Sequence, residues 1–329
     1  MGLRDWLRLA RAVPSAWDLR KILISAVGLI ALGLGASALD RLAPGAAPLP
    51  IWGDWGGHIG VPLRGPSDLS DVALRAAMMM AEPVHLLVGP LVHLFARTAS
   101  IVPTLLQLVW TLAVMGVVGG ALAHMELAEA ATGERPGVAA SLAFAFRRAP
   151  SVIAAPLHPL LIVLMLGLMS AVLGKATALA ALVLGLFSAV LLLEMVASWP
   201  LIHAAVAAES ETAVEAIGRC YGYVNHRPLT LATALAVGWA LGSVGLAAFE
   251  LFLRSAFSLG EWGVGIGLSN PGATGMRWES GPSPWVALMK LTWEAWAFAF
   301  FWASAARTYL LLRQDLDDIP AWGSAAARR

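Results

Sequence analysis

The stretch TALAALVLGLFSAVLLLEMVASW, residues 177–199, carries a single charged side chain, Glu194. An α-helix needs about 20 predominantly apolar residues to cross the roughly 30 Å hydrocarbon core of a bilayer. Five further runs of similar length and character lie at residues 22–39, 101–123, 152–174, 229–252 and 284–306. The sequence therefore predicts a membrane protein with six spanning helices.

Composition indicates the same class of protein. Charged residues make up 13% of the 329 residues and apolar residues 59%, whereas a soluble domain carries about 25% charged residues. Spanning segments must satisfy their own backbone amides, so they are helices or closed barrels. Barrel strands are about 10 residues of alternating character, and these runs are longer and unbroken. We predict an all-α integral membrane protein, a six-helix bundle with interfacial amphipathic helices and two periplasmic loops rich in Gly and Trp.

Several functions find no support in the sequence. The net charge of +1 lacks the basic footprint of a nucleic-acid-binding protein. Cys220 is the only cysteine, and none of the seven histidines has a recognised ligand spacing. The letters of a dinucleotide fingerprint, starting at Gly33, lie inside an apolar run and not between a strand and a helix. We predict no metal, no cofactor and no catalytic residue, with a membrane enzyme as the least favoured alternative.

The distribution of Lys and Arg predicts the topology, because cytoplasmic loops carry an excess of these residues. With six spans, fourteen lie on the side of both termini and seven on the other, leaving out Lys290 within the last run. We predict a bacterial inner-membrane protein with both termini in the cytoplasm. The first run should stay attached as a signal anchor, because its 18 residues exceed the usual 7–15 of a cleaved signal.

The domain organisation follows from these runs. Residues 1–21 should form a cytoplasmic interfacial helix, because two tryptophans alternate there with basic residues. Residues 22–312 form the membrane domain, and residues 313–329 form a cytoplasmic tail. The periplasmic loops are residues 40–100 and 253–283.

The loop at 40–100 contains a short helix through Met80 and a second apolar segment, residues 84–96. That segment has 13 residues and contains Pro90, so we expect it to be interfacial or re-entrant and not to span the membrane.

Two cytoplasmic amphipathic helices are expected ahead of spans. The second span should continue as a polar helix as far as Thr132, where turn residues follow, and residues 139–148 should form an amphipathic piece before Pro150. Between spans four and five, Thr212 and Glu215 match a capping box. The Gly-xxx-Gly pairs that start at Gly116 and Gly238 predict close helix packing.

Ionisable residues inside the spans are the candidate functional residues, because each costs a few kcal/mol at the bilayer centre unless it is paired or hydrated. Glu250, Lys290 and Glu294 fall at similar depth and predict a cluster in the outer leaflet. That cluster is either an ion pair that fixes the fifth span to the sixth, or a polar path or substrate site, and we favour the ion pair. Glu194 is the best single functional candidate, with His203, His124 or a tyrosine as its expected partner. A second, cytoplasmic polar cluster is expected from His124, Glu126, Glu129, Arg219 and Arg227.

Several motifs resemble a family of polytopic membrane proteins known mainly from planctomycete-type bacteria. They are Ser198-Trp199-Pro200, Ala216-Ile-Gly-Arg219-Cys-Tyr221, Gly260-Glu-Trp262-Gly and Arg307-Thr-Tyr309. The chain is also distantly similar to the membrane domains that accompany glycerophosphodiester phosphodiesterases. His124 and Gly222 depart from the family pattern. The resemblance implies the architecture and assigns no catalytic residue.

The predicted function is that of a non-catalytic scaffold or accessory subunit of a larger membrane assembly. Its expected contacts are the lipid bilayer and other membrane proteins. The alternative is a transporter or lipid-handling protein that uses the intramembrane acids. A transporter should bring a water-accessible cavity to those acids, whereas a scaffold should bury them in pairs.

Overall fold

The computed structural model describes residues 3–46, 66–96, 98–175, 177–209, 212–267 and 284–317. All regular structure in these ranges is helical, as predicted. The helices are α1 (Leu3–Ala10), α2 (Ala12–Ala16), α3 (Leu19–Leu42), α4 (Pro66–Phe95), α5 (Ile101–Thr132), α6 (Val138–Leu173), α7 (Ala178–Glu209), α8 (Ala213–His226), α9 (Pro228–Gly267) and α10 (Pro284–Asp317).

Six of the described helices are long and apolar enough to cross a membrane, which is the predicted number. They are α3, α4, α5, α6, α7 and α9. The predicted run at 284–306 forms α10, which is not in this set, and α4 is in it instead. The chain is therefore a helical membrane protein, and its set of six long apolar helices differs from the predicted set by one helix.

Helix α10 tolerates polar residues because other helices enclose it. Trp293, Trp296 and Trp302 are completely buried, and α10 contacts α3, α5, α7 and α9. A helix surrounded by protein does not need the uniformly apolar surface that lipid requires. From Trp293 onward, α10 thus forms the core of the molecule, whereas Trp285 and Leu288 in its first turns are 68% and 53% exposed.

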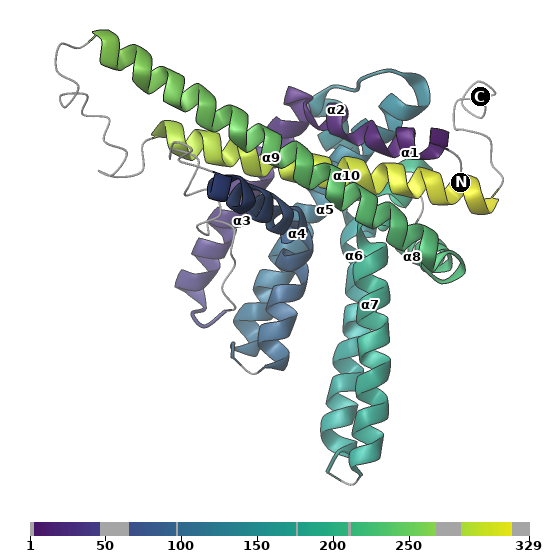
Figure 1. Cartoon of the computed structure of the whole chain (residues 1–329). Helices are drawn as coiled ribbons and strands as arrows, with labels where there is room; N and C mark the ends of the chain where they lie inside the picture. Colours follow the sequence, from purple (N-terminus) through teal and green to yellow (C-terminus); the bar gives the residue numbers. More distant parts are fainter. Residues whose placement is uncertain are drawn as a thin grey trace.

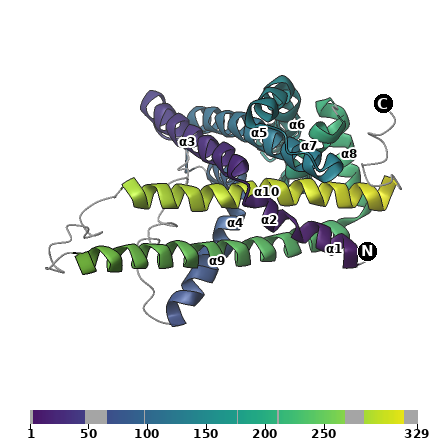
Figure 2. The ribbon, with the colours of Figure 1, turned by 90° about the horizontal axis from the view of Figure 1, so that it is seen from above.

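The helices form two groups that cross. Figure 1 shows α6 and α7 as a long hairpin that projects from the molecule, while α9 and α10 run side by side across its base. Figure 2 confirms this arrangement from above, with α6 and α7 seen nearly end-on and α1 and α2 lying along α10. The beginning and the end of the described chain meet, because Arg8 Nη1 donates a 2.7 Å hydrogen bond to Gln314 Oε1.

The α6–α7 hairpin is covered with exposed apolar side chains. Leu168, Leu182 and Leu186 are 62%, 69% and 67% exposed, and only 6% of the most apolar window of α7 is buried inside the molecule. Apolar surface of this extent is rare on soluble monomers. Contact with lipid accounts for it.

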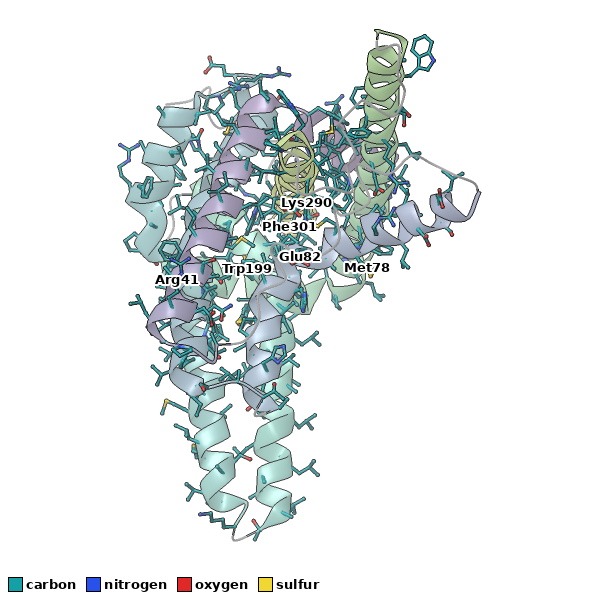
Figure 3. The ribbon with its side chains drawn as sticks, turned by 90° about the vertical axis from the view of Figure 1, so that its left-hand side faces the viewer. Arg41, Met78, Glu82, Trp199, Lys290 and Phe301 are labelled. Carbon is teal, nitrogen blue, oxygen red and sulfur yellow. The ribbon has the colours of Figure 1, made fainter. Side chains whose placement is uncertain are left out.

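The prediction of a separate segment at residues 84–96 is wrong, because these residues continue α4 as far as Phe95. Two prolines, Pro83 and Pro90, lie inside the helix. A proline removes one backbone hydrogen bond and bends a helix, and Figure 3 shows α4 changing direction near Glu82. The helix therefore lies against α9 before this bend and continues toward α5 after it.

Two other predicted boundaries are also wrong. The amphipathic piece at 139–148 and the span at 152–174 form one helix, α6, which continues through Pro150. Helix α9 extends to Gly267, well past the predicted end at residue 252. Neighbouring helices allow prolines and glycines to remain inside long membrane helices. The Gly- and Trp-rich parts of the predicted loops, at 47–65 and 268–283, and the tail after residue 317 lie outside the described residues.

The helix ends outside the predicted spans agree more closely with the prediction. Helix α5 ends at Thr132, and Gly133 caps it in the left-handed conformation (φ 71°). The capping box of Thr212 and Glu215 is present at the start of α8. One helix was predicted over residues 1–21, whereas the structure has two short helices, α1 and α2, and begins α3 at Leu19. Leu9 packs against α9 and α10. Local sequence signals are therefore reliable at these helix ends.

Glycines permit the closest helix contacts. A Cβ on Gly242 would lie 2.6 Å from Phe300 Cε1, and one on Gly119 would lie 2.7 Å from Trp302 Cζ2. A Cβ on Gly116 would lie 3.1 Å from Ile153 of α6. The predicted packing role of both Gly-xxx-Gly pairs is thus confirmed.

Candidate functional site

The intramembrane acid Glu250 is fully buried and paired with arginine. Its Oε1 lies 2.8 Å from Arg75 Nη2 and 3.4 Å from Arg254 Nε. Arg75 belongs to α4, so the pair joins α4 to α9. The sequence predicted Lys290 and Glu294 as the neighbours of Glu250, and the structure adds Arg75 and Arg254 as its ion-pair partners.

The other half of the predicted cluster lies on α10. Glu294 is 2% exposed, and both Lys290 and Glu82 lie within electrostatic reach of its carboxylate. Glu82 is also buried, at the bend of α4 (Figure 3). Lys290 and Glu294 both belong to α10, whereas Glu82 adds a second carboxylate from α4, which lies 3.8 Å from His85 of its own helix.

Glu194 is half-buried on α7, and Tyr221 lies within electrostatic reach of its carboxylate. Burial, together with the negative charge of Glu194, raises the pKa of Tyr221 on α8 to about 12. Tyr221 is therefore neutral at physiological pH and keeps its hydroxyl proton. The other proposed partners bond elsewhere: His203 Nδ1 lies 3.0 Å from the Trp199 carbonyl oxygen, and His124 Nδ1 lies 3.4 Å from Ser141 Oγ.

The predicted cytoplasmic cluster is divided among separate sites. The His124 ring stacks on Phe144 at a centroid distance of 4.3 Å. Arg219 binds Glu209, and Arg227 is exposed between α8 and α9. Glu126 and Glu129 alone belong to one network, which includes residues that the sequence analysis missed.

That network surrounds a buried lysine. Lys21 Nζ at the start of α3 lies 2.5 Å from Glu126 Oε2 and 3.2 Å from Glu129 Oε2. Ser15 Oγ donates a 2.5 Å hydrogen bond to the same oxygen of Glu126. The side chains of Lys21 and Glu126 are 1% and 0% exposed. The network therefore ties the amino-terminal helices to α5.

Two arginines extend the network outward. Arg307 Nη2 on α10 lies 2.5 Å from Glu126 Oε1, and Arg135 Nε lies 3.0 Å from Glu129 Oε1. Glu126 thus carries two cations from two different helices. Lys21 directly precedes the apolar run at 22–39, and Arg307 directly follows the run at 284–306. Both therefore lie at the end where Glu126 and Glu129 project, and this shared depth was the only signal of pairing in the sequence.

A third group links α7, α8 and α10. Glu209 accepts a 2.8 Å hydrogen bond from the hydroxyl of Tyr309 and lies 2.9 Å from Arg219 Nη2 and 3.1 Å from Arg313 Nε. Burial and the neighbouring Glu209 carboxylate raise the pKa of Tyr309 above its ordinary value. The tyrosine is therefore a fixed hydrogen-bond donor.

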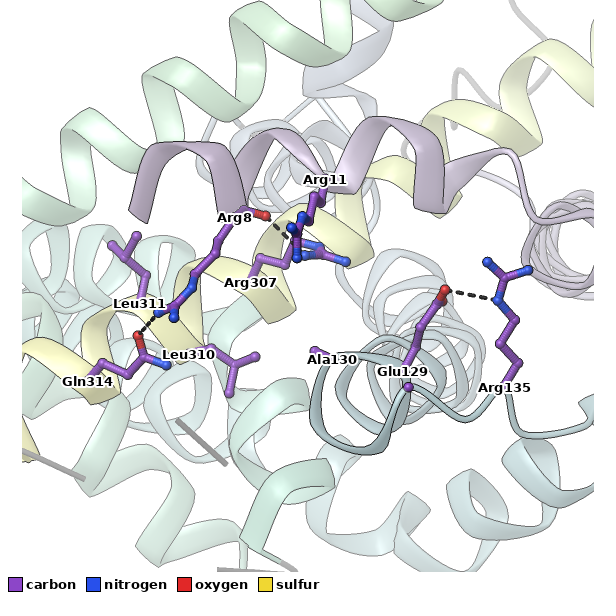
Figure 4. Close-up of a pocket in the computed structure, with 10 residues that line it drawn as sticks. Arg8, Arg11, Glu129, Ala130, Arg135, Arg307, Leu310, Leu311 and Gln314 are labelled. Carbon is purple, nitrogen blue, oxygen red and sulfur yellow. Dashed lines mark hydrogen bonds and ion pairs between the residues drawn. The ribbon is translucent and has the colours of Figure 1, made fainter. Parts of the chain in front are cut away.

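A cavity of about 500 Å³ lies beside the Glu126–Glu129 network, and we call it the arginine pocket. Figure 4 shows side chains from α1, α5, α10 and the α5–α6 loop around it. Its lining residues are Arg8, Arg11, Glu129, Ala130, Gly133, Arg135, Arg307, Leu310, Leu311 and Gln314. Four arginines thus border one hollow, together with a single described carboxylate.

A second cavity, of about 480 Å³, is an apolar groove between α3, α5 and α6. It is lined by side chains such as Leu23, Val114 and Phe146. Neither cavity is lined by Glu194, Glu250, Lys290 or Glu294. Within the described part of the chain, no three metal-ligating side chains converge.

Comparisons with known proteins give no relative. No family model, no curated protein and no solved structure matches this chain.

Proposed function

We propose that this protein is a non-catalytic scaffold or accessory subunit of a membrane assembly. We place it in a bacterial inner membrane with both termini in the cytoplasm, as the distribution of Lys and Arg predicts. The family resemblance seen in the sequence agrees with a structural role, because its motifs carry no catalytic residue.

The buried charges support a structural role. Glu250, Glu126 and Glu209 each pair with cations from at least one other helix. A transport path needs acids that line a water-accessible cavity, whereas these carboxylates hold helices together. Ion pairs of this kind fix the register of helices against one another.

The observation that carries the proposal is that two glycines of the α6–α7 hairpin make no close contact inside the molecule. A Cβ on Gly167 or Gly185 would meet no atom within 4 Å, whereas Gly116, Gly119 and Gly242 all lie in tight internal contacts. Small residues on membrane helices allow another helix to approach closely. The two glycines therefore offer a docking face for the transmembrane helix of a partner protein.

The test compares three forms of the full-length chain extracted from native membranes into nanodiscs. The wild-type protein should carry a partner polypeptide at a fixed molar ratio. Gly185→Leu should lose that partner, because the added side chain blocks close approach, while the unfolding midpoint of the isolated protein stays unchanged. Val183→Leu adds bulk to a different face of the same helix and serves as the matched control. Equal partner recovery in all three forms would remove the hairpin face from the proposal.

Lipid handling is the second candidate function, and the apolar groove favours it. The lining of the groove is apolar throughout, and it lies between helices long enough to span the membrane. An acyl chain fits such a lining. If Val114→Trp filled the groove and removed a lipid that co-purifies with the wild-type protein, lipid handling would become the better explanation.

A further inference from the structure

We propose that the arginine pocket binds a negatively charged phosphate group. This inference is independent of the scaffold role, because the pocket lies away from the α6–α7 hairpin and uses different residues. The phosphate belongs either to the headgroup of an anionic lipid or to a free phosphate-bearing solute.

The arginine pocket and the Glu126–Glu129 network beside it carry a net positive charge. Among the described residues, five cations are present, namely Lys21, Arg8, Arg11, Arg135 and Arg307, against the two carboxylates of Glu126 and Glu129. Each of the two carboxylates already forms ion pairs with two cations. Positive charge therefore remains on the side of the pocket that faces solvent.

Two arginines of the pocket have N–H donors that are available to a ligand. Arg11 is exposed and lines the pocket, and its guanidinium makes no hydrogen bond or ion pair with any described residue. Arg135 uses Nε for Glu129, and its side chain is 65% exposed, so its terminal nitrogens remain accessible. A guanidinium presents N–H donors in a planar fork that matches phosphate oxygens. Two such forks on one hollow are suited to an oxyanion.

Contacts within the protein hold other cationic side chains of the pocket in place. Arg307 is held at Nη2 by Glu126 and at Nη1 by the Arg8 carbonyl oxygen, 3.0 Å away. Figure 4 shows this bond and the Glu129–Arg135 pair on opposite sides of the hollow. The cationic wall is thus fixed before any ligand arrives, which lowers the entropic cost of binding.

The shape of the site favours a phosphate over an extended acidic peptide. The pocket volume of about 500 Å³ is that of a small-molecule site. Its arginines converge on one space and do not form a stripe along a surface. The pocket also lies beside α1, whose Leu7 is 56% exposed, and an amphipathic helix of this kind places a headgroup-sized anion nearby.

The experiment uses the full-length protein in neutral maltoside micelles at low ionic strength, with calorimetric titration. The probes are dioctanoyl phosphatidylglycerol, dioctanoyl phosphatidylcholine, sodium phosphate and sodium succinate. Saturable binding of phosphatidylglycerol alone identifies a lipid headgroup, and binding of sodium phosphate identifies a free solute. Both results support a phosphate site. Succinate binding as strong as that of either phosphate probe would overturn it, and so would the absence of binding by all probes.

Variants locate the binding. Arg11→Gln should weaken the binding of the successful probe about tenfold, as expected for the loss of one charge-assisted contact. Adding Arg135→Gln should weaken it about a hundredfold relative to wild type. Arg147→Gln removes an exposed arginine outside the pocket and should change affinity less than about twofold. Equal affinities for Arg11→Gln and Arg147→Gln, with unchanged melting temperatures, would show that the anion binds elsewhere.

Discussion

The buried lysine–glutamate network predicts an order of stability losses among three neutralising variants. The side chains of Glu126 and Lys21 are 0% and 1% exposed, so each depends on its partner for the solvation that water would supply. Removing one partner of a buried pair costs about 3–5 kcal/mol, because it leaves an uncompensated charge. The three variants are Glu126→Gln, Lys21→Met and Arg135→Gln.

The structure ranks these losses. Glu126→Gln leaves both Lys21 and Arg307 without their closest carboxylate, so it belongs at the upper end, near about 5 kcal/mol. Lys21→Met leaves Glu126 with Arg307, so we expect about 3 kcal/mol. Arg135→Gln breaks a pair whose arginine is 65% exposed, and such surface pairs contribute about 0–1 kcal/mol.

Equilibrium unfolding in mixed micelles, followed by tryptophan fluorescence, measures these losses. The Lys21→Met/Glu126→Gln double variant should lose less than the sum of the two single variants, because the two residues are in contact. If Glu126→Gln and Arg135→Gln had equal stability, the reasoning from burial would be refuted.

Three further predictions concern other parts of the molecule. Gly242→Ala should destabilise the protein by about 1–3 kcal/mol through overpacking against Phe300. Gly222→Ala should be neutral or stabilising by up to about 1 kcal/mol, because nothing lies within 4 Å of its Cβ position. Unfolding curves that show equal losses of stability for the two variants would contradict this. Thr212→Ala should cost about 1 kcal/mol through loss of the capping box, visible as faster amide exchange in the first turn of α8, and unchanged exchange would count against the cap. Absorbance titration should show one tyrosine, Tyr221, ionising near pH 12. Glu194→Gln should lower that pKa, because a negative carboxylate opposes formation of the phenolate. An unchanged pKa in the variant would show that Glu194 does not interact with Tyr221.

Local signals in the sequence predicted the parts of the fold that depend on neighbouring residues. The end of α5 before Gly133 and the capping box of α8 depend on side chains within a few positions. The apolar runs predicted the number of long apolar helices for the same reason. The bent helix α4 was missed because the apolar segment at 84–96 is short and contains Pro90, whereas packing against α9 keeps the helix continuous.

Pairing between distant helices could not be predicted in the same way. Glu250 was expected to lie beside Lys290, but its ion-pair partner Arg75 lies 175 residues away on a helix whose course was misjudged. Likewise, nothing local indicated that Lys21 reaches Glu126. The sequence also treated 284–306 as one more span, because enclosure by other helices, which makes α10 the core, is a property of the whole fold.

The scaffold role is tested most directly by the composition of the native particle. Native mass spectrometry of the protein in nanodiscs should show a complex with a second polypeptide at a fixed ratio. The Gly185→Leu variant should appear without that polypeptide, and Val183→Leu should retain it. A wild-type particle that contains only a single copy of this chain and lipid would contradict the account.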